Sequence, residues 1–201
     1  MSRTFLAIAA IVVVLLVVGG WVASTYNRLV GLDQSVEAQW AQVENVYQRR
    51  ADLVPNLVET VKGAAEFERE TYTAVTEARA KVGQVSAQAG ADPSRDPEAF
   101  RRRQEAQGQL GSALSRLLVV AENYPDLKAT AAFRDLQAQL EGTENRISVE
   151  RMRFNETARD YNTALQTFPT NLVVGVFGAR FDERPYFAAE AGAEEAPAVK
   201  F

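Results

Sequence analysis

The 201-residue chain contains neither histidine nor cysteine. The usual protein ligands for zinc, haem, copper and iron–sulfur clusters are therefore missing, and Ser-His, Cys-His and thiol catalysis are excluded. Disulfide bonds are excluded for the same reason. We therefore expect no cofactor and no metal site, and we predict that the protein is not an enzyme.

Neither sign of charge dominates the chain. It has 22 basic and 26 acidic residues, a net charge of −4, so nothing draws the whole molecule to nucleic acid. The densest basic patch, 101–103, lies beside Glu98 and Glu105 and indicates ordinary surface ion pairs. Glutamates cluster at 66–70 and 141–150, but carboxylate metal sites in helical bundles also use histidine, so these indicate solvated helix faces. We expect no nucleic-acid partner.

One long apolar run lies near the N-terminus, after a short flank of residues 1–4. Residues 5–23 carry no charge, and as a helix they would span roughly 28 Å, close to one bilayer core. A cleaved signal peptide is the alternative, but the small-residue cleavage site is poor. We predict an uncleaved transmembrane helix in the lipid bilayer. Its anchor residues are Phe5, Leu6, Ile8, Ile11, Val14, Leu15, Leu16, Val18 and Trp21.

The charges that flank this span give a slight orientation bias. Arg3 and the amino terminus lie on the short side, whereas Arg28 is the only cation in the twenty residues that follow the span. Positive charge favours the cytoplasmic side. This predicts a single-pass protein of the cytoplasmic (inner) membrane with its main domain on the periplasmic or extracellular side.

Beyond residue 23, apolar residues recur every three or four positions, and no stretch alternates as a strand would. This predicts an all-α domain over residues 24–169. Basic Arg49 and Arg50 suit the end of a first helix, Asp52 suits a cap, and Pro55 is tolerated in the first turn of the next helix. We therefore expect a corner near residue 51. The predicted helices are 24–51, 53–89, 97–122 and 130–168.

The fourth predicted helix has the clearest pattern. Its large apolar residues lie seven apart, as in coiled coils, at Phe133, Leu140, Ile147, Phe154, Tyr161 and Phe168. The turn-forming stretches 90–97 and 123–126 break the chain before it. Four helices with short corners favour a transmembrane helix that continues into a long antiparallel four-helix bundle. An extended helical hairpin that polymerises would bury the same stripes and remains the alternative.

An antiparallel bundle would bring residue 168 back to the membrane surface. The segment 170–187 that follows is too apolar for an ordinary linker, so we expect it to dock on the bundle, on the membrane interface or on a neighbouring subunit. The final stretch, 188–201, lacks a core pattern and is expected to be a mobile acidic tail. The candidate docking or oligomer contacts are Leu172, Val174, Val176, Phe177 and Phe181.

Polar residues interrupt the apolar seams. Buried amides and guanidinium groups need partners, and in bundles such groups often set the register, so we predict structural roles for them. Trp40 is most simply a core anchor. The seam residues in question are Asn27, Arg50, Asn56, Asn123, Asn145, Asn155 and Asn162.

Several stretches resemble the LemA family over residues 1–187: YNRLV at 26–30, the run at 36–68, EARA at 77–80, ENYPDLKA at 122–129, and the run at 133–169. The resemblance implies a single-pass membrane protein with a long antiparallel helical domain and no established enzymatic activity. It also implies a short extracellular N-terminus, which opposes the charge bias. The candidate structural or interaction residues are Trp40, Tyr47, Arg49, Arg50, Asp52, Pro55, Asn56, Tyr124, Pro125, Glu144, Asn145, Asn155, Tyr161, Asn162 and Phe168.

Two hypotheses for function follow. The first is a membrane-tethered, self-associating helical scaffold of the bacterial cell envelope, a homo-oligomer without catalytic chemistry. The alternative is a module that binds an envelope ligand or regulates a membrane protease, with Trp40, Tyr47, Arg50 and Asn145 lining a polar cleft. Membrane proteases and other envelope proteins are candidate partners only because of the family resemblance.

Overall fold

The computed structural model describes residues 3–63, 68–88, 92–177 and 180–188, and within these ranges it contains helices and no strands. The predicted all-α class is confirmed. The predicted tail lies outside the described residues, apart from Ala188. The helices are α1 (Arg3–Lys62), α2 (Arg69–Ala87), α3 (Pro97–Ala121), α4 (Pro125–Ala129), α5 (Ala131–Gln166) and α6 (Thr170–Phe177).

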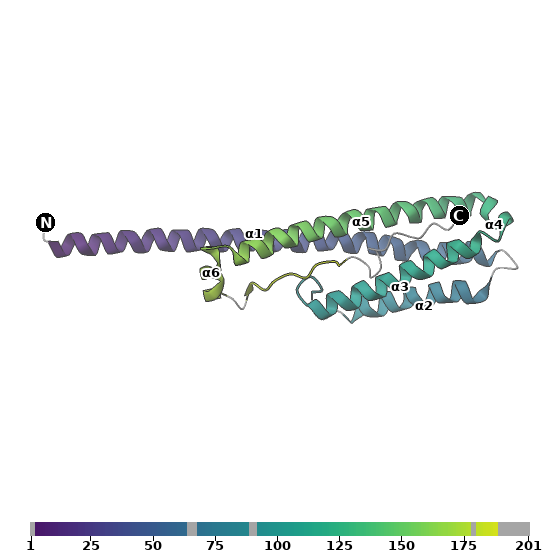
Figure 1. The fold of residues 1–201 in the computed structure, drawn as a ribbon, viewed down its shortest axis with the longest axis horizontal. Coiled ribbons are helices and arrows are strands. Elements are labelled where there is room, and N and C mark those ends of the chain that lie inside the picture. The colour runs from purple at the N-terminus through teal and green to yellow at the C-terminus, as the bar shows by residue number, and fades with distance from the viewer. Residues whose placement is uncertain (1–2, 64–67, 89–91, 178–179, 189–201) are drawn as a thin grey trace, which may run out of the picture.

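Helix α1 dominates the shape of the molecule. It has 60 residues, which corresponds to about 90 Å, and its N-terminal part projects beyond all other elements (Figure 1). The side chains of this projecting part are exposed, Leu16 for example to 71 %. It is long and apolar enough to cross a membrane, and it is not buried inside the protein as a core helix would be. The helix then continues into the packed domain without interruption.

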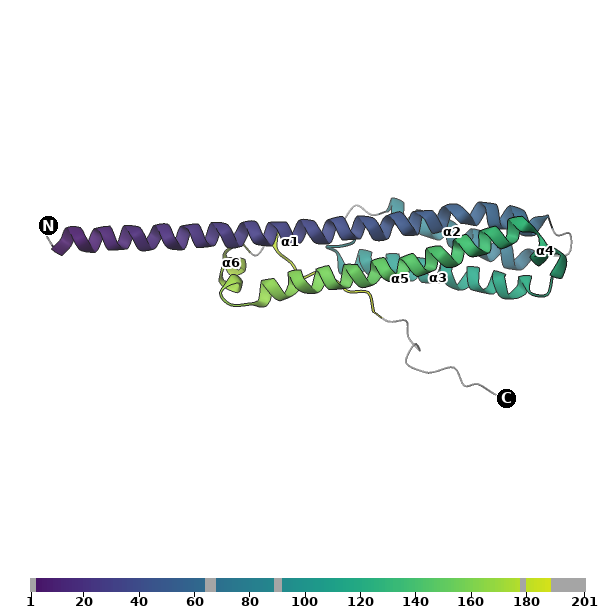
Figure 2. The same cartoon turned by 90° about the horizontal axis from the view of Figure 1, so that it is seen from above.

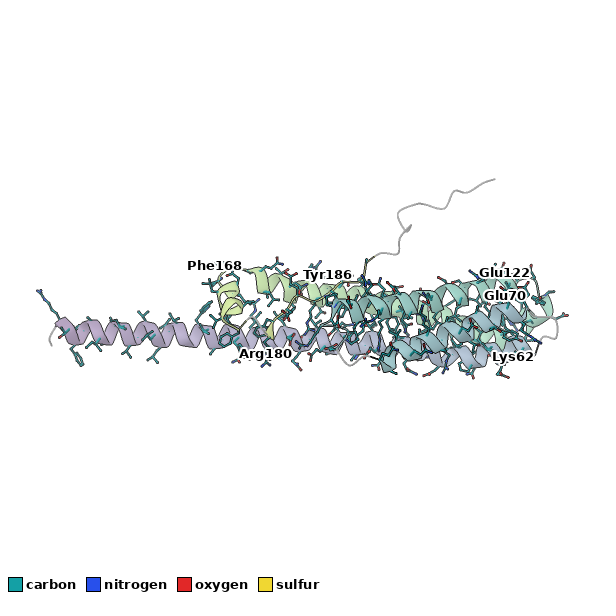
Figure 3. The ribbon with its side chains drawn as sticks, turned by 90° about the horizontal axis from the view of Figure 1, so that it is seen from below. Lys62, Glu70, Glu122, Phe168, Arg180 and Tyr186 are labelled. Carbon is teal, nitrogen blue, oxygen red and sulfur yellow. The ribbon has the colours of Figure 1, made fainter. Side chains whose placement is uncertain are left out.

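The domain consists of two antiparallel helix pairs. Helix α1 packs along α5, α2 packs along α3, and α1 also contacts α2 (Figures 1 and 2). The turns marked by Lys62, Glu70 and Glu122 gather at the end far from the N-terminus, whereas Phe168 and Arg180 lie towards the projecting helix (Figure 3). The chain therefore returns towards the anchor, as an antiparallel bundle requires.

Two apolar clusters hold the pairs together. The cluster far from the anchor joins all four long helices, through residues such as Val61, Val75, Leu117 and Phe133. The cluster near the anchor joins α1 and α5 to Phe100 and to residues that follow α6. Of the six residues in the predicted heptad series, the first five lie on α5 and are buried. Phe168 is 74 % exposed, because α5 has already ended at Gln166.

The corner expected near residue 51 does not exist, because α1 runs through this point to Lys62. Proline lacks a backbone N–H, so Pro55 leaves the carbonyl of Ala51 without its helical partner. The Nε of Arg79, on α2, donates to this carbonyl at 2.9 Å. A side chain of the neighbouring helix thus replaces the missing hydrogen bond, and the chain turns only after Lys62.

Replacing Arg79 with methionine should lower the free energy of unfolding by about 1 kcal/mol, since the Ala51 carbonyl loses its donor. In a Pro55→Ala background, Arg79→Met should lower the free energy of unfolding by less. The alanine supplies the backbone N–H that proline lacks and restores the helical hydrogen bond to Ala51. A double-mutant cycle measured by urea unfolding checks the coupling. Equal costs in both backgrounds would contradict this account of the proline.

The later helix boundaries follow from capping. Asp96 accepts hydrogen bonds from the backbone of Glu98 at 2.8 Å and Ala99 at 3.2 Å, and Pro97 opens α3. The NYPD stretch separates α3 from the short α4, which begins at Pro125. Thr130 then caps α5 by accepting from the backbone of Phe133 at 3.3 Å. Local sequence signals determine these boundaries.

Candidate functional site

After α6 the chain runs back over the bundle in an extended conformation, and we call residues 180–187 the strap. Two asparagines of α5 hold its backbone. Asn162 donates to the carbonyl of Arg184 and accepts from its N–H, both at 2.9 Å. Asn155 makes the same pair with Phe187, at 2.9 and 2.8 Å. Each amide thus satisfies both backbone groups of one strap residue.

The spacing of this clamp follows from chain geometry. Asn155 and Asn162 lie seven residues apart, about 10.5 Å along a helix. Arg184 and Phe187 lie three residues apart, about 10 Å along an extended chain. Because the two repeats match, the strap can run antiparallel to α5 with both contacts unstrained. The strap is therefore docked in a defined register.

Below the strap lies a cluster of charges around the buried ion pair of Asp33 and Arg184. The carboxylate of Asp33, on α1, accepts hydrogen bonds from Arg184 and, at 2.6 Å, from Arg95 in the loop before α3. Arg184 also donates to the hydroxyl of Ser94 at 3.1 Å, and its side chain is 1 % exposed. Arg95 also bonds Glu37 on α1. The cluster thus connects α1, the α2–α3 loop and the strap.

An aromatic cluster also connects α1 to the strap. Trp40 is 5 % exposed and lies 5.4 Å from Phe100 and 5.5 Å from Phe154, between ring centroids. Phe187, at the end of the strap, lies 4.6 Å from Phe100 and stacks on Trp40 at 6.1 Å. Rings from α1, α3, α5 and the strap therefore meet in one core. The prediction that Trp40 is a core anchor agrees with its placement.

Tyr161 lies beside the charge cluster. Burial and the nearby charge of Asp33 raise its pKa to about 12, although Arg184 acts in the opposite direction. The pKa of an unfolded tyrosine is about 10. Between these values the native state keeps a proton that the unfolded state has released, so stability should fall as pH rises through this window.

Tyr161→Phe should therefore flatten the decline in unfolding free energy between pH 10 and about 12. At neutral pH the variant should change stability little, because the Tyr161 hydroxyl is buried without a hydrogen-bond partner among the described residues. Urea unfolding of both proteins across this pH range gives the comparison. Parallel pH profiles would refute the assignment.

A groove of about 1050 Å³ opens between α3 and α5. On the α3 side it is lined by small residues, among them Gly108, Gly111, Ser112 and Ser115, and on the α5 side by polar and apolar residues from Leu140 to Arg151. Ala188, the residue after the strap, also lines the groove. Small side chains permit close approach, so the groove suits a slender polar segment or a helix.

The floor of this groove contains a buried cation. Arg50 is 3 % exposed and donates to both carboxylate oxygens of Glu144, at 2.9 and 3.1 Å. It also donates to the backbone carbonyl of Gln107 at 2.8 Å. Arg151 donates to the hydroxyl of Tyr47 at 2.9 Å, and burial raises the pKa of Tyr47 although Arg151 opposes this. These contacts tie α1, α3 and α5 together along the groove.

Of the four residues predicted to line a polar cleft, two line this groove. Arg50 and Asn145 line the groove, whereas Trp40 is in the aromatic core and Tyr47 reaches the groove only through Arg151. Arg49 is exposed on the outer face of the α1–α5 pair. Tyr124 and Pro125 mark the start of α4.

Other seam assignments need correction, because these side chains lie on the surface of their helices. Asp52 caps no helix and accepts from Gln48 at 2.7 Å, and Asn56 is exposed. The side chains of Asn27, Asn123 and Asn145 are also exposed.

Sequence reasoning did not single out Asp33, Arg95 or Arg184. A signal existed for Asp33, since it occupies an apolar position in the three-four spacing of α1 between Leu29 and Val36. A charge at such a position indicates a buried partner. That partner, Arg184, is 151 residues away in sequence and could not be found from periodicity. Among the described residues, no group of three or more acidic side chains could hold a metal ion.

The fold and these sites define a membrane-associated helical protein, in which an exposed apolar N-terminal helix continues into paired helices locked by a strap. The LemA family profile matches residues 39–201, and the chain belongs to this family.

Three relatives support this placement. The magnetosome protein MamQ of Magnetospirillum gryphiswaldense is 26 % identical over 178 residues, covering 80 % of this chain and 65 % of MamQ. Magnetosome protein MamQ 2 of Paramagnetospirillum magneticum is 25 % identical with the same coverage. Protein LemA of Metamycoplasma hominis is 22 % identical over 147 residues, covering 73 % of this chain and 62 % of the relative. The chain thus spans less than two thirds of the length of these relatives. None of their names denotes an enzyme.

Proposed function

We propose that the protein is a non-catalytic, self-associating scaffold that is tethered to the bacterial inner membrane and holds an interaction groove at a set height above the bilayer. The observation that carries this proposal is the continuity of α1 from the exposed apolar span to Lys62. Arg50, on the groove floor, is 27 residues beyond Ala23, which corresponds to about 40 Å of helix. A stiff connection of this kind suits a spacer or scaffold.

The groove supports a helical partner, and a second copy of this chain is the partner we favour. Its α3 wall of glycine and serine lets a helix backbone approach, while Leu118 supplies an apolar contact. The orientation that we propose, with the bundle outside the cytoplasm, rests on the flanking charges. A reporter enzyme fused to the C-terminus tests it, since activity confined to the cytosol would reverse the orientation.

The absence of native cysteine makes self-association directly testable. Ser112→Cys, in the groove wall, should give a disulfide-linked dimer in oxidised membranes, whereas Glu77→Cys, exposed on α2, should not. Light scattering of the detergent-solubilised wild type should give a mass above that of a monomer at micromolar concentration. A monomer in solution together with no crosslink at Ser112 would refute self-association.

The groove also favours a second candidate, a binding module for a polar envelope ligand or a regulatory segment of a membrane protease. The charged groups Arg50, Glu141, Glu144 and Arg151 provide the polar chemistry. A thermal-shift screen separates the two, because a ligand that binds only the native state raises the melting temperature, whereas a scaffold responds to none.

A further inference from the structure

Helix α6 presents an apolar face that no part of the described chain covers. Leu172 is 58 % exposed and Val176 77 %, and Phe168, in the turn before α6, is 74 % exposed. These side chains are as exposed as those of the anchor. Thr170–Phe177 contains no charged residue. A surface helix in water normally turns its polar residues outward, so this face requires an apolar environment.

The opposite face of α6 is fixed to α1. Val173 is buried, and the ring of Phe177 lies edge-on to Tyr26 with 5.3 Å between centroids. Phe181, near the start of the strap, also contacts Tyr26, with 5.5 Å between ring centroids. The outward direction of Leu172 and Val176 is therefore a defined feature of the fold.

The position of α6 along α1, close to the end of the apolar span, indicates which apolar environment covers its exposed face. Tyr26 is three residues beyond Ala23, the last residue of the apolar span, which corresponds to about 4.5 Å of helix. Figures 1 and 3 show α6 beside α1 where the helix leaves the bundle towards the N-terminus. A helix at this level lies at the boundary of lipid headgroups and acyl chains. The apolar face is thus continuous with the lipid-facing surface of the anchor.

Two cations lie at the same level. Arg28 is exposed on α1, and the guanidinium of Arg180 lies 5.6 Å from the centroid of the Tyr26 ring. Long basic side chains of this kind reach phosphate groups while their stems stay in contact with apolar surface. The acidic residues nearest in the chain, Asp182 and Glu183, lie further along the strap, and Glu183 accepts from Gln166 at 2.7 Å. Arg28 and Arg180 can therefore pair with lipid phosphate groups beside α6.

We propose that α6 is a second membrane contact, an interfacial helix whose exposed Leu172 and Val176 enter the bilayer beside the transmembrane helix. Because the strap connects α6 to the charge and aromatic clusters, this contact restrains the tilt of the whole bundle relative to the membrane. The proposal rests on membrane insertion of residues 5–23.

Nitroxide labelling tests it in the full chain, since every introduced cysteine is unique. Leu172→Cys and Val176→Cys would be labelled singly in protein reconstituted into phosphatidylcholine–phosphatidylglycerol vesicles. Accessibility to oxygen, which partitions into lipid, is compared with accessibility to a water-soluble nickel chelate. Val14→Cys in the anchor and Met152→Cys, 63 % exposed on α5, are the lipid and water controls.

The expected result is that labels at 172 and 176 favour oxygen, as at 14, with a depth of about 5–10 Å below the headgroups. Nickel accessibility equal to that at 152 would overturn the proposal. Labels that are shielded from both reagents and show spin–spin broadening, removed by dilution with unlabelled protein, would place a second copy on this face and also overturn it. Nickel access at 14 would instead show that the anchor is not inserted, and the proposed tethering would fail with it.

Discussion

Replacing Asp33 with alanine should lower the free energy of unfolding of the bundle by about 3–5 kcal/mol, the range for removing one partner of a buried ion pair. The Arg184 side chain is 1 % exposed and would lose its closest carboxylate. Arg95 would keep Glu37. Arg184 would keep a 3.8 Å contact with Glu37 and its hydrogen bond to Ser94, so most of the cost arises from the weaker pairing of this buried charge. Denaturant unfolding followed by circular dichroism in detergent measures it.

Two matched variants isolate the cause. Glu105→Ala removes the partner of Arg101 in a pair whose side chains are 63 % and 70 % exposed, and should cost no more than about 1 kcal/mol. The double variant Asp33→Leu/Arg184→Met removes both charges and should recover much of the loss, because apolar groups need no partner. If Asp33→Ala were no more costly than Glu105→Ala, the buried ion pair of Asp33 and Arg184 would not stabilise the fold.

The second large effect is expected for Trp40→Ala, at about 3–5 kcal/mol. The substitution removes the ring that touches Phe100, Phe154 and Phe187, from three different parts of the chain. The neighbouring rings are held by their own helices and cannot close the cavity fully. The lost van der Waals contacts therefore reduce stability in addition to the lost burial of apolar area. Thermal unfolding followed by far-ultraviolet circular dichroism is the measurement.

Trp21→Ala is a control of the same residue type. Trp21 is in the projecting part of α1 and contacts none of the clusters, so the bundle should unfold as in the wild type. Trp40→Phe should fall between the wild type and Trp40→Ala, since it keeps an aromatic ring. Wild-type stability of Trp40→Ala would contradict a core role for this residue.

Much of the fold is readable along the chain because its signals are local. The heptads from Phe133 to Tyr161 predict a long buried stripe, and these residues are buried. Asp96–Pro97 predicts the start of α3 for a reason confined to one turn, because a side-chain oxygen caps the backbone and proline tolerates the first position.

Prediction failed where a distant residue reverses a local preference. The signals at Arg50, Asp52 and Pro55 are genuine helix-boundary signals, yet Arg79 satisfies the carbonyl that the proline frees, and the helix continues. Asn155 and Asn162 could be marked as polar seam residues, but their partners are backbone groups of the strap, which have no sequence signature.

The amino-acid sequence by itself determined the all-α class, the apolar span at residues 5–23 and the faces of the helices, since composition and periodicity act within a few turns. Only the tertiary structure decided the length of α1, the pairing of Asp33 with Arg184, the register of the strap and the exposed face of α6. Each of these depends on groups far apart in the chain, and their contacts form only when the helices pack.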